Sequence, residues 1–146
     1  MTIREIFKKQ KQPLLNIYFT AGFPRKESLL EILPALEAAG ADMVEVGIPY
    51  SDPLSDGPTI QHSSAVALSN GITVDNIFGQ LSDCSTDLPL LVMGYFNTVL
   101  QYGLEKFCKK CNESGVTGVI LPDLPIDIYE EHYKPSFEKY NLSNVF

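Results

Sequence analysis

Three carboxylates stand close together in the segment VEVGIPYSDPLSDGP (residues 44–58): Glu45, Asp52 and Asp56. Glu45 lies inside the run MVEVG, whose other members are apolar or glycine, as in the interior of a β-strand. Burial of a charged carboxylate is costly, so its presence in such a strand indicates a chemical role. A desolvated carboxylate has a raised pKa and can hold or deliver a proton near neutral pH. The alternative is an edge strand that leaves Glu45 in solvent.

The loop after this strand is rich in residues that restrict or redirect the backbone. It contains Pro49, Pro53 and Pro58, and Gly57 permits an unusual turn. We expect this loop to hold Asp56 over the end of the strand, facing Glu45, where the two would form a catalytic pair of carboxylates. An isolated aspartate in such a loop would more often be a turn residue.

Metal sites are not indicated by the sequence. The stretch DPLSDG begins like a calcium-binding loop, but the third and twelfth positions are Leu54 and Ser63, which removes two ligands. The CKKC pair, Cys108 and Cys111, lies late in a helical run and lacks the second pair that a structural zinc site requires. We therefore expect ordinary helix thiols, and the three cysteines fit a reducing compartment.

The elements that must position these residues alternate along the chain as strands and helices. Expected strands cover residues 13–22, 42–49, 88–97, 116–125 and the start of a fifth at 142–146. Expected helices cover residues 26–40, 59–71, 73–84, 98–115 and 126–141, the last with a break near Pro135. This alternation is typical of a parallel α/β protein with right-handed crossovers.

Two parallel architectures fit that alternation, an open doubly wound sheet and a closed barrel. The first βα turn has no G-x-G-x-x-G pattern and the chain has no P-loop, so the nucleotide-binding fingerprints are missing. Polar residues instead mark the ends of the expected strands: Thr20, Glu45, Asn97 and Asp123. Polar residues at the carboxyl ends of successive strands are typical of barrel enzymes, which favours a barrel, although periodicity alone does not decide between the two.

Length and charge restrict the remaining possibilities. The 146 residues suffice for one domain, and the net charge of −7 with a pI near 4.7 argues against a nucleic-acid or anionic-membrane surface. No apolar run approaches the roughly 18 residues of a membrane span. The start, MTIREIFKKQKQ, lacks the apolar core of a signal peptide, so we expect a cytoplasmic protein.

The segment VEVGIPYSDPLSDGPTIQ closely resembles the signature of the tryptophan synthase α-subunit family, the indole-3-glycerol-phosphate lyases. The resemblance continues in IYFTAGFP, MGYFN and GVTGVILPDLP, and departs from the family mainly at Ser55, where a small apolar residue is common. It implies a TIM barrel, no cofactor in this subunit, and a β-subunit partner that carries pyridoxal phosphate in an α2β2 heterotetramer.

The resemblance also implies roles for individual residues. Glu45 would move the proton and Asp56 would bind the N–H of the indole ring. Three positions match residues that line the indole pocket, although each could equally be barrel packing: Tyr18, Tyr95 and Ile120. Three more match positions near the β-subunit contact: Asp52, Pro53 and Asn97.

A complete TIM barrel needs about 250 residues. We therefore expect residues 1–146 to form a single partial barrel domain of the first four to five βα units, with the phosphate site beyond Phe146. Such a chain is expected to be inactive alone. The alternatives are a non-catalytic half-barrel that serves as a binding or assembly module and, less in keeping with the loop, a different phosphate-utilising barrel enzyme.

Overall fold

The computed structural model describes residues 3–9 and 12–146. Residues 1, 2, 10 and 11 lie outside the described residues. The expectation for the N-terminal segment 1–12, which has no signal-peptide core in its sequence, therefore falls partly outside them. Its described portion contains helix α1 (Ile3–Lys9), whose first residue is buried.

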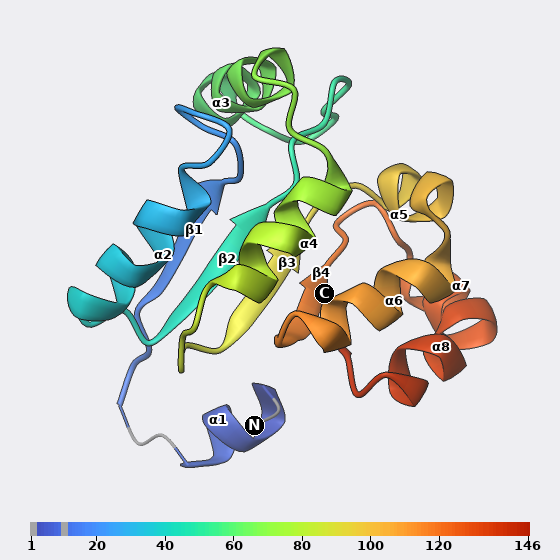
Figure 1. Ribbon diagram of the computed structural model, residues 1–146. Helices are drawn as coiled ribbons and strands as arrows, with labels where there is room; N and C mark the ends of the chain where they lie inside the picture. The colour runs from blue at the N-terminus through green and yellow to red at the C-terminus, as the bar shows by residue number, and fades with distance from the viewer. Residues whose placement is uncertain (1–2, 10–11) are drawn as a thin grey trace.

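Five parallel strands form one sheet, and their order in space is their order in the sequence (Figure 1). They are β1 (Asn16–Thr20), β2 (Met43–Gly47), β3 (Leu90–Met93), β4 (Val116–Ile120) and β5 (Ser143–Val145). A doubly wound sheet would reverse its strand order at a switch point, whereas a barrel wall adds each strand beside the last. The sequential order is therefore that of a barrel wall, and the prediction of a barrel over an open doubly wound sheet is confirmed.

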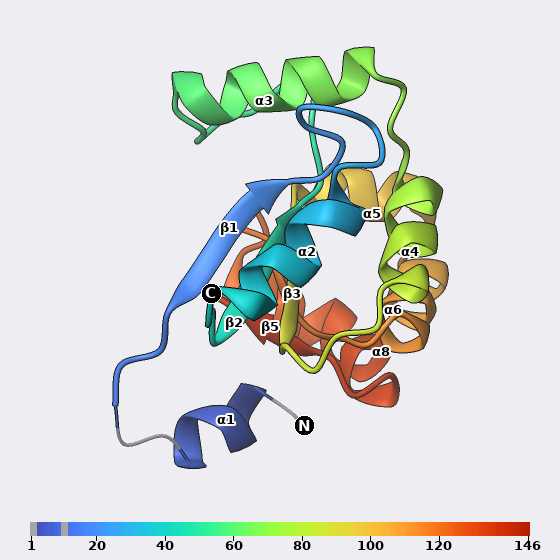
Figure 2. The same ribbon diagram turned by 60° about the vertical axis from the view of Figure 1, so that its left-hand side comes forward.

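The helices that connect the strands cover one face of this sheet, as the two views in Figures 1 and 2 agree. This layer contains α2 (Leu29–Ala38), α4 (Val74–Asp83), α6 (Leu104–Glu113) and α8 (Lys134–Lys139). Helix α3 (Pro58–Ser69) lies instead across the carboxyl ends of the first strands, beside the loop that carries Asp56. Within the described ranges, no helix has the length and apolar character that crossing a membrane requires.

Alternation along β2 separates the two faces of the sheet. Val44 and Val46 are fully buried in the core between sheet and helices. Met43 packs on the opposite face with Leu91 and with Ile3 of α1. Glu45 lies on this second face, the inner side of the barrel wall, as the alternation predicts.

Two expected helices are divided in the structure. The run 98–115 forms α5 (Phe96–Tyr102) and α6, separated by Gly103, whose φ of 95° is in a region that glycine enters readily. The run 126–141 forms α7 (Ile126–Ile128), a π-helical turn η1 (Tyr129–Tyr133) and α8. The division falls just before Pro135, which lies in the first turn of α8, because proline is tolerated there but not in a helix interior.

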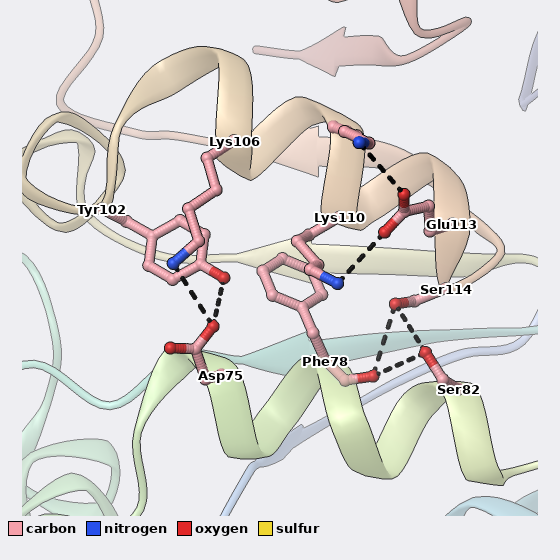
Figure 3. A network of polar contacts seen from close by, with 9 residues as sticks. Asp75, Phe78, Ser82, Tyr102, Lys106, Lys110, Glu113 and Ser114 are labelled. Carbon is pink, nitrogen blue, oxygen red and sulfur yellow. Dashed lines mark hydrogen bonds and ion pairs between the residues drawn. The ribbon is translucent and has the colours of Figure 1, made fainter.

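Polar contacts fasten α4 to α5 and α6 in the outer layer (Figure 3). The Tyr102 hydroxyl donates to Asp75 Oδ1 at 2.5 Å, and Lys106 Nζ lies 3.6 Å from the same oxygen. At the other end of α4, the hydroxyls of Ser82 and Ser114 are 3.1 Å apart. These contacts lie between the helices of this layer, which covers the face of the sheet opposite to Glu45.

Two of the three cysteines are buried packing residues. Cys108 and Cys111 are fully buried in α6, and burial raises the pKa of the Cys108 thiol to about 12 and that of Cys111 well above its ordinary range. Thiols held in this protonated form are poor nucleophiles and poor metal ligands.

Candidate active site

Glu45 lies on the inner face of β2, half-buried, beside Tyr18, its register partner on β1. Asn16, two residues before Tyr18 and therefore on the same face, donates a hydrogen bond from Nδ2 to Glu45 Oε1. The carboxylate faces a cavity of about 210 Å³ that Ile120 also lines. The other lining side chains are mainly apolar: Ile3, Phe7, Leu14, Met43, Leu91 and Val145.

Tyr18 lies across the adjacent strand, over Gly47. A Cβ atom at position 47 would overlap the Tyr18 hydroxyl and ring, so glycine is what allows the ring to lie there. Burial raises the pKa of Tyr18, and the negative charges of Asp56 and Glu45 add to that effect. The hydroxyl therefore keeps its proton and lies within electrostatic reach of both carboxylates.

Asp56 reaches the same region from the loop between β2 and α3. Together with Tyr18 and Tyr95 it lines a second, small cavity of about 20 Å³. The loop is anchored on both sides of Asp56. Ser55 donates its backbone N–H to the Tyr95 hydroxyl at 3.1 Å, and Gln61 Nε2 donates to the Asp56 carbonyl at 2.8 Å. The buried ring of Tyr95 thus holds the loop as well as lining the cavity.

The residues matched to the partner contact lie in this loop, which contains Asp52 and Pro53, and at the start of α5, which contains Asn97. Asn97 Nδ2 donates to the Tyr50 hydroxyl at 3.1 Å, and the Tyr50 and Tyr95 rings stack with centroids 4.9 Å apart at 27°. Asp52 is exposed and accepts a hydrogen bond of 2.6 Å from Ser51 Oγ. An aromatic stack therefore connects the exposed outer side of the loop to the anchor beside Asp56.

The two carboxylates do not share one cavity. Glu45 bonds to Asn16, toward the N-terminal end of β1, and Asp56 lies toward the carboxyl ends of the strands. Tyr18 connects them, since it pairs with Glu45 in register and lines the cavity of Asp56. Tyr18 thus lies near both carboxylates, and the predicted arrangement with Asp56 directly facing Glu45 stays a prediction.

Two residues of this site, Asn16 and Tyr50, were not predicted from the sequence. Asn16 could have been found from strand alternation, which places it on the face of Tyr18. Tyr50 had no comparable signal, because a tyrosine in a loop gives no indication of its stacking partner. Asp123, expected among the polar strand ends, accepts the backbone N–H of Phe96 at 2.9 and 3.1 Å and so fixes the start of α5.

Comparison with known proteins gives a consistent result. A family model described as tryptophan synthase alpha chain matches residues 5–146. The tryptophan synthase alpha chain of Flavobacterium psychrophilum is 53% identical over 140 residues, which cover 94% of this chain and 55% of the relative. That of Parabacteroides distasonis is 46% identical over 145 residues, covering 98% of this chain and 56% of the relative.

Solved structures agree with the sequence comparison. The crystal structure of the tryptophan synthase subunit alpha from Legionella pneumophila superposes with a TM-score of 0.89 at 34% identity, covering 96% of this chain and 54% of that one. The chain thus spans about half the length of the relatives it matches, and its five strands correspond to about half of their TIM barrel.

Proposed function

The chain belongs to the tryptophan synthase alpha chain family, a family of lyases in tryptophan biosynthesis, and we propose that the protein containing it cleaves indole-3-glycerol phosphate to indole and glyceraldehyde 3-phosphate. The observation that carries this proposal is the placement of two carboxylates around one tyrosine. Glu45 lies on the inner face of β2, Asp56 lies on the loop that follows the same strand, and the charges of both act on the Tyr18 hydroxyl.

The reaction is a retro-aldol cleavage that needs a proton at the indole ring. An indolyl carbanion is a poor leaving group, so C3 of the ring is protonated before the bond to the side chain breaks. The side-chain hydroxyl loses its proton as its carbon becomes the aldehyde. We assign both proton movements to Glu45, which faces a mainly apolar cavity on the inner face of the sheet.

Asp56 has an electrostatic role in this proposal. Its carboxylate accepts the ring N–H and stabilises the positive charge that develops on the protonated ring. Ile120 and Tyr18 supply the apolar surface for the ring, in support of which Ile120 lines the cavity of Glu45 and Tyr18 that of Asp56. Tyr95 lines the second cavity and holds the loop.

The proposal includes a partner, the β subunit of an α2β2 heterotetramer in the cytoplasm, with pyridoxal phosphate in the β subunit and no cofactor in this one. Asp52, Pro53 and Asn97 would contact it. An exposed apolar side chain in the same loop supports this assignment, because Leu54 is 84% exposed beside Pro53. A large apolar side chain so exposed is suited to burial against another protein.

A chimera tests the activity. In it, residues 1–146 replace the matching part of the Flavobacterium psychrophilum alpha chain, so that the relative supplies the rest of the barrel. We expect the chimera to release indole from indole-3-glycerol phosphate. Glu45→Gln should lower kcat at least ~10²-fold, in the range of a lost acid–base group, with substrate binding retained. The exposed Glu31→Gln serves as the matched control.

Asp56 is tested in the same chimera. Asp56→Asn should keep more activity than Asp56→Ala, because the amide oxygen can still accept a hydrogen bond from the ring. A folded chimera that releases no indole, or a Glu45→Gln variant with unchanged kcat, would contradict the proposal. Near-UV circular dichroism establishes that each variant is folded.

A further inference from the structure

Three hydroxyl groups form a chain that runs from the candidate site into α3. The Tyr18 hydroxyl lies 3.2 Å from Thr20 Oγ1, and Thr20 Oγ1 lies 2.7 Å from Ser63 Oγ. Ser63 Oγ in turn donates to the backbone carbonyl of Ile60 at 3.0 Å. Thr20 and Ser63 are buried, so water does not readily replace these contacts.

All three contacts can be hydrogen bonds together in only one direction, because each hydroxyl has a single hydrogen to donate. A carbonyl only accepts, so Ser63 uses its hydrogen on Ile60. In the other two contacts either oxygen could donate, and all three contacts are satisfied together when Thr20 donates to Ser63 and Tyr18 donates to Thr20. In that direction the hydrogen of Tyr18 is used on Thr20, so the phenol oxygen can only accept a hydrogen bond from a further partner.

The cavity itself has the size of a single polar group. Its volume of about 20 Å³ is close to the room that one water molecule occupies. Tyr18 and Asp56 both line it. In the direction given above the Tyr18 oxygen is an acceptor, and the Asp56 carboxylate is an acceptor when ionised. A group that donates hydrogen bonds satisfies both Tyr18 and Asp56. A carbonyl or phosphate oxygen has no hydrogen to donate and would be repelled by the lone pairs of both acceptors.

We propose that Tyr18 is a hydrogen-bond acceptor for the substrate, that Thr20 and Ser63 set this direction as positioning residues, and that the cavity between Tyr18 and Asp56 selects an N–H or O–H donor. This inference rests on the proposed function, since indole-3-glycerol phosphate supplies both kinds of donor, the ring N–H and the side-chain hydroxyls. Thr20 and Ser63 act on the substrate only through Tyr18.

Three unreactive phosphate esters test the donor preference by calorimetry with the chimera. The first has an indole ring and a side chain without hydroxyls, so that only the ring N–H donates. The second has a benzofuran ring and a hydroxylated side chain, so that only the hydroxyls donate. The third, a benzofuran without hydroxyls, has no donor. We expect the first or the second to bind about tenfold more tightly than the third, which identifies the group in the cavity.

Variants then test the direction of the chain. Tyr18→Phe and Thr20→Val should each weaken binding of the preferred ester about tenfold and leave the third unchanged. The double variant should bind like either single one, because Thr20 acts through Tyr18. Thr20→Ser, which keeps the hydroxyl, should bind like the unmodified chimera. Ser63→Ala should also weaken binding, because Thr20 can then donate to Tyr18 and reverse the chain. If Thr20→Val fails to fold, Ser63→Ala serves in its place.

Two results would overturn the inference: unchanged affinity for both donor-bearing esters in Tyr18→Phe, or a donor preference that survives in both Thr20→Val and Ser63→Ala. The exposed Thr59→Val is the matched control. Failure of the proposed function is distinguishable, because it appears as an unmodified, folded chimera that does not cleave the substrate.

Discussion

Replacement of Gly47 by alanine tests whether the Tyr18 ring lies where the site requires it. The added Cβ would lie 2.6 Å from Cζ and 2.7 Å from Cε2 of Tyr18, and closer still to its hydroxyl. Contacts below 3.0 Å force a displacement. The ring atoms are stiff and the strand is paired on both sides, so we expect the ring to leave the inner face of β2. Such overpacking costs ~1–3 kcal/mol of unfolding free energy.

The measurement is urea unfolding of the chimera, with indole release as the second readout. The loss of stability corresponds to about 2–4 °C in Tm per kcal/mol for a domain of this size. Activity should fall in the same variant, because the displaced phenol no longer lines the cavity of Asp56. Combining Gly47→Ala with Tyr18→Leu should restore stability but not activity, since leucine removes the ring atoms that the new methyl group meets.

Gly79 provides the matched control for this substitution. It lies in α4 with no atom within 4 Å of an added Cβ, so Gly79→Ala should stabilise the protein by ~0.5–1 kcal/mol through helix propensity. We therefore expect Gly47→Ala to lower the unfolding free energy and Gly79→Ala to raise it. If Gly47→Ala is as stable as Gly79→Ala, Tyr18 does not occupy the space over Gly47, and the assignment of Tyr18 to the site is refuted.

Three other substitutions separate the loop, the partner surface and the outer layer. Tyr95→Phe removes the acceptor of the Ser55 N–H, and we expect kcat/KM for indole release to fall about tenfold with little change in unfolding free energy, because the exposed amide can bond to water. Leu54→Ser should weaken binding of the β subunit about tenfold in calorimetry without a change in Tm, since this side chain is exposed here. The hydrogen bond from Lys139 is the main cause that lowers the pKa of Glu105 from 4.5 to about 2. Ionised Glu105 therefore stabilises the folded state at pH values above 4.5, and this contribution is lost as the pH falls from 4.5 toward 2. Glu105→Gln should therefore flatten the loss of stability between these pH values in acid unfolding, and an unchanged acid limb would contradict the assignment.

Much of the barrel wall was predictable because a strand has a period of two residues. Val44 and Val46 could be assigned to the helix-covered face and Glu45 to the inner face before any contact was known. The choice between a barrel and an open sheet was less secure. Both architectures use the same alternation of strands and helices, and strand order depends on how units pack against each other in space.

Local boundaries were less predictable where a residue type permits two outcomes. A glycine such as Gly103 lowers the stability of a continuous helix by only ~1 kcal/mol relative to alanine, so its presence alone does not predict that the helix ends there. In the structure it adopts a φ of 95°, which divides the predicted helix and turns α6 against α4. The break near Pro135 was easier to predict, because proline cannot supply the backbone hydrogen bond of a helix interior.

The arrangement of the site could not be derived from alternation, because alternation fixes the face of a residue and not its neighbours along the sheet. Tyr18 and Glu45 meet through the register of β1 with β2, which depends on packing of the whole layer. Asp56 joins them through a loop anchor on Tyr95, far along the chain. The direction of the hydroxyl chain was harder still to predict from the sequence, because it depends on the acceptor at the far end of the chain, the Ile60 carbonyl. A carbonyl in α3 therefore determines which hydrogen-bonding groups the site can accept.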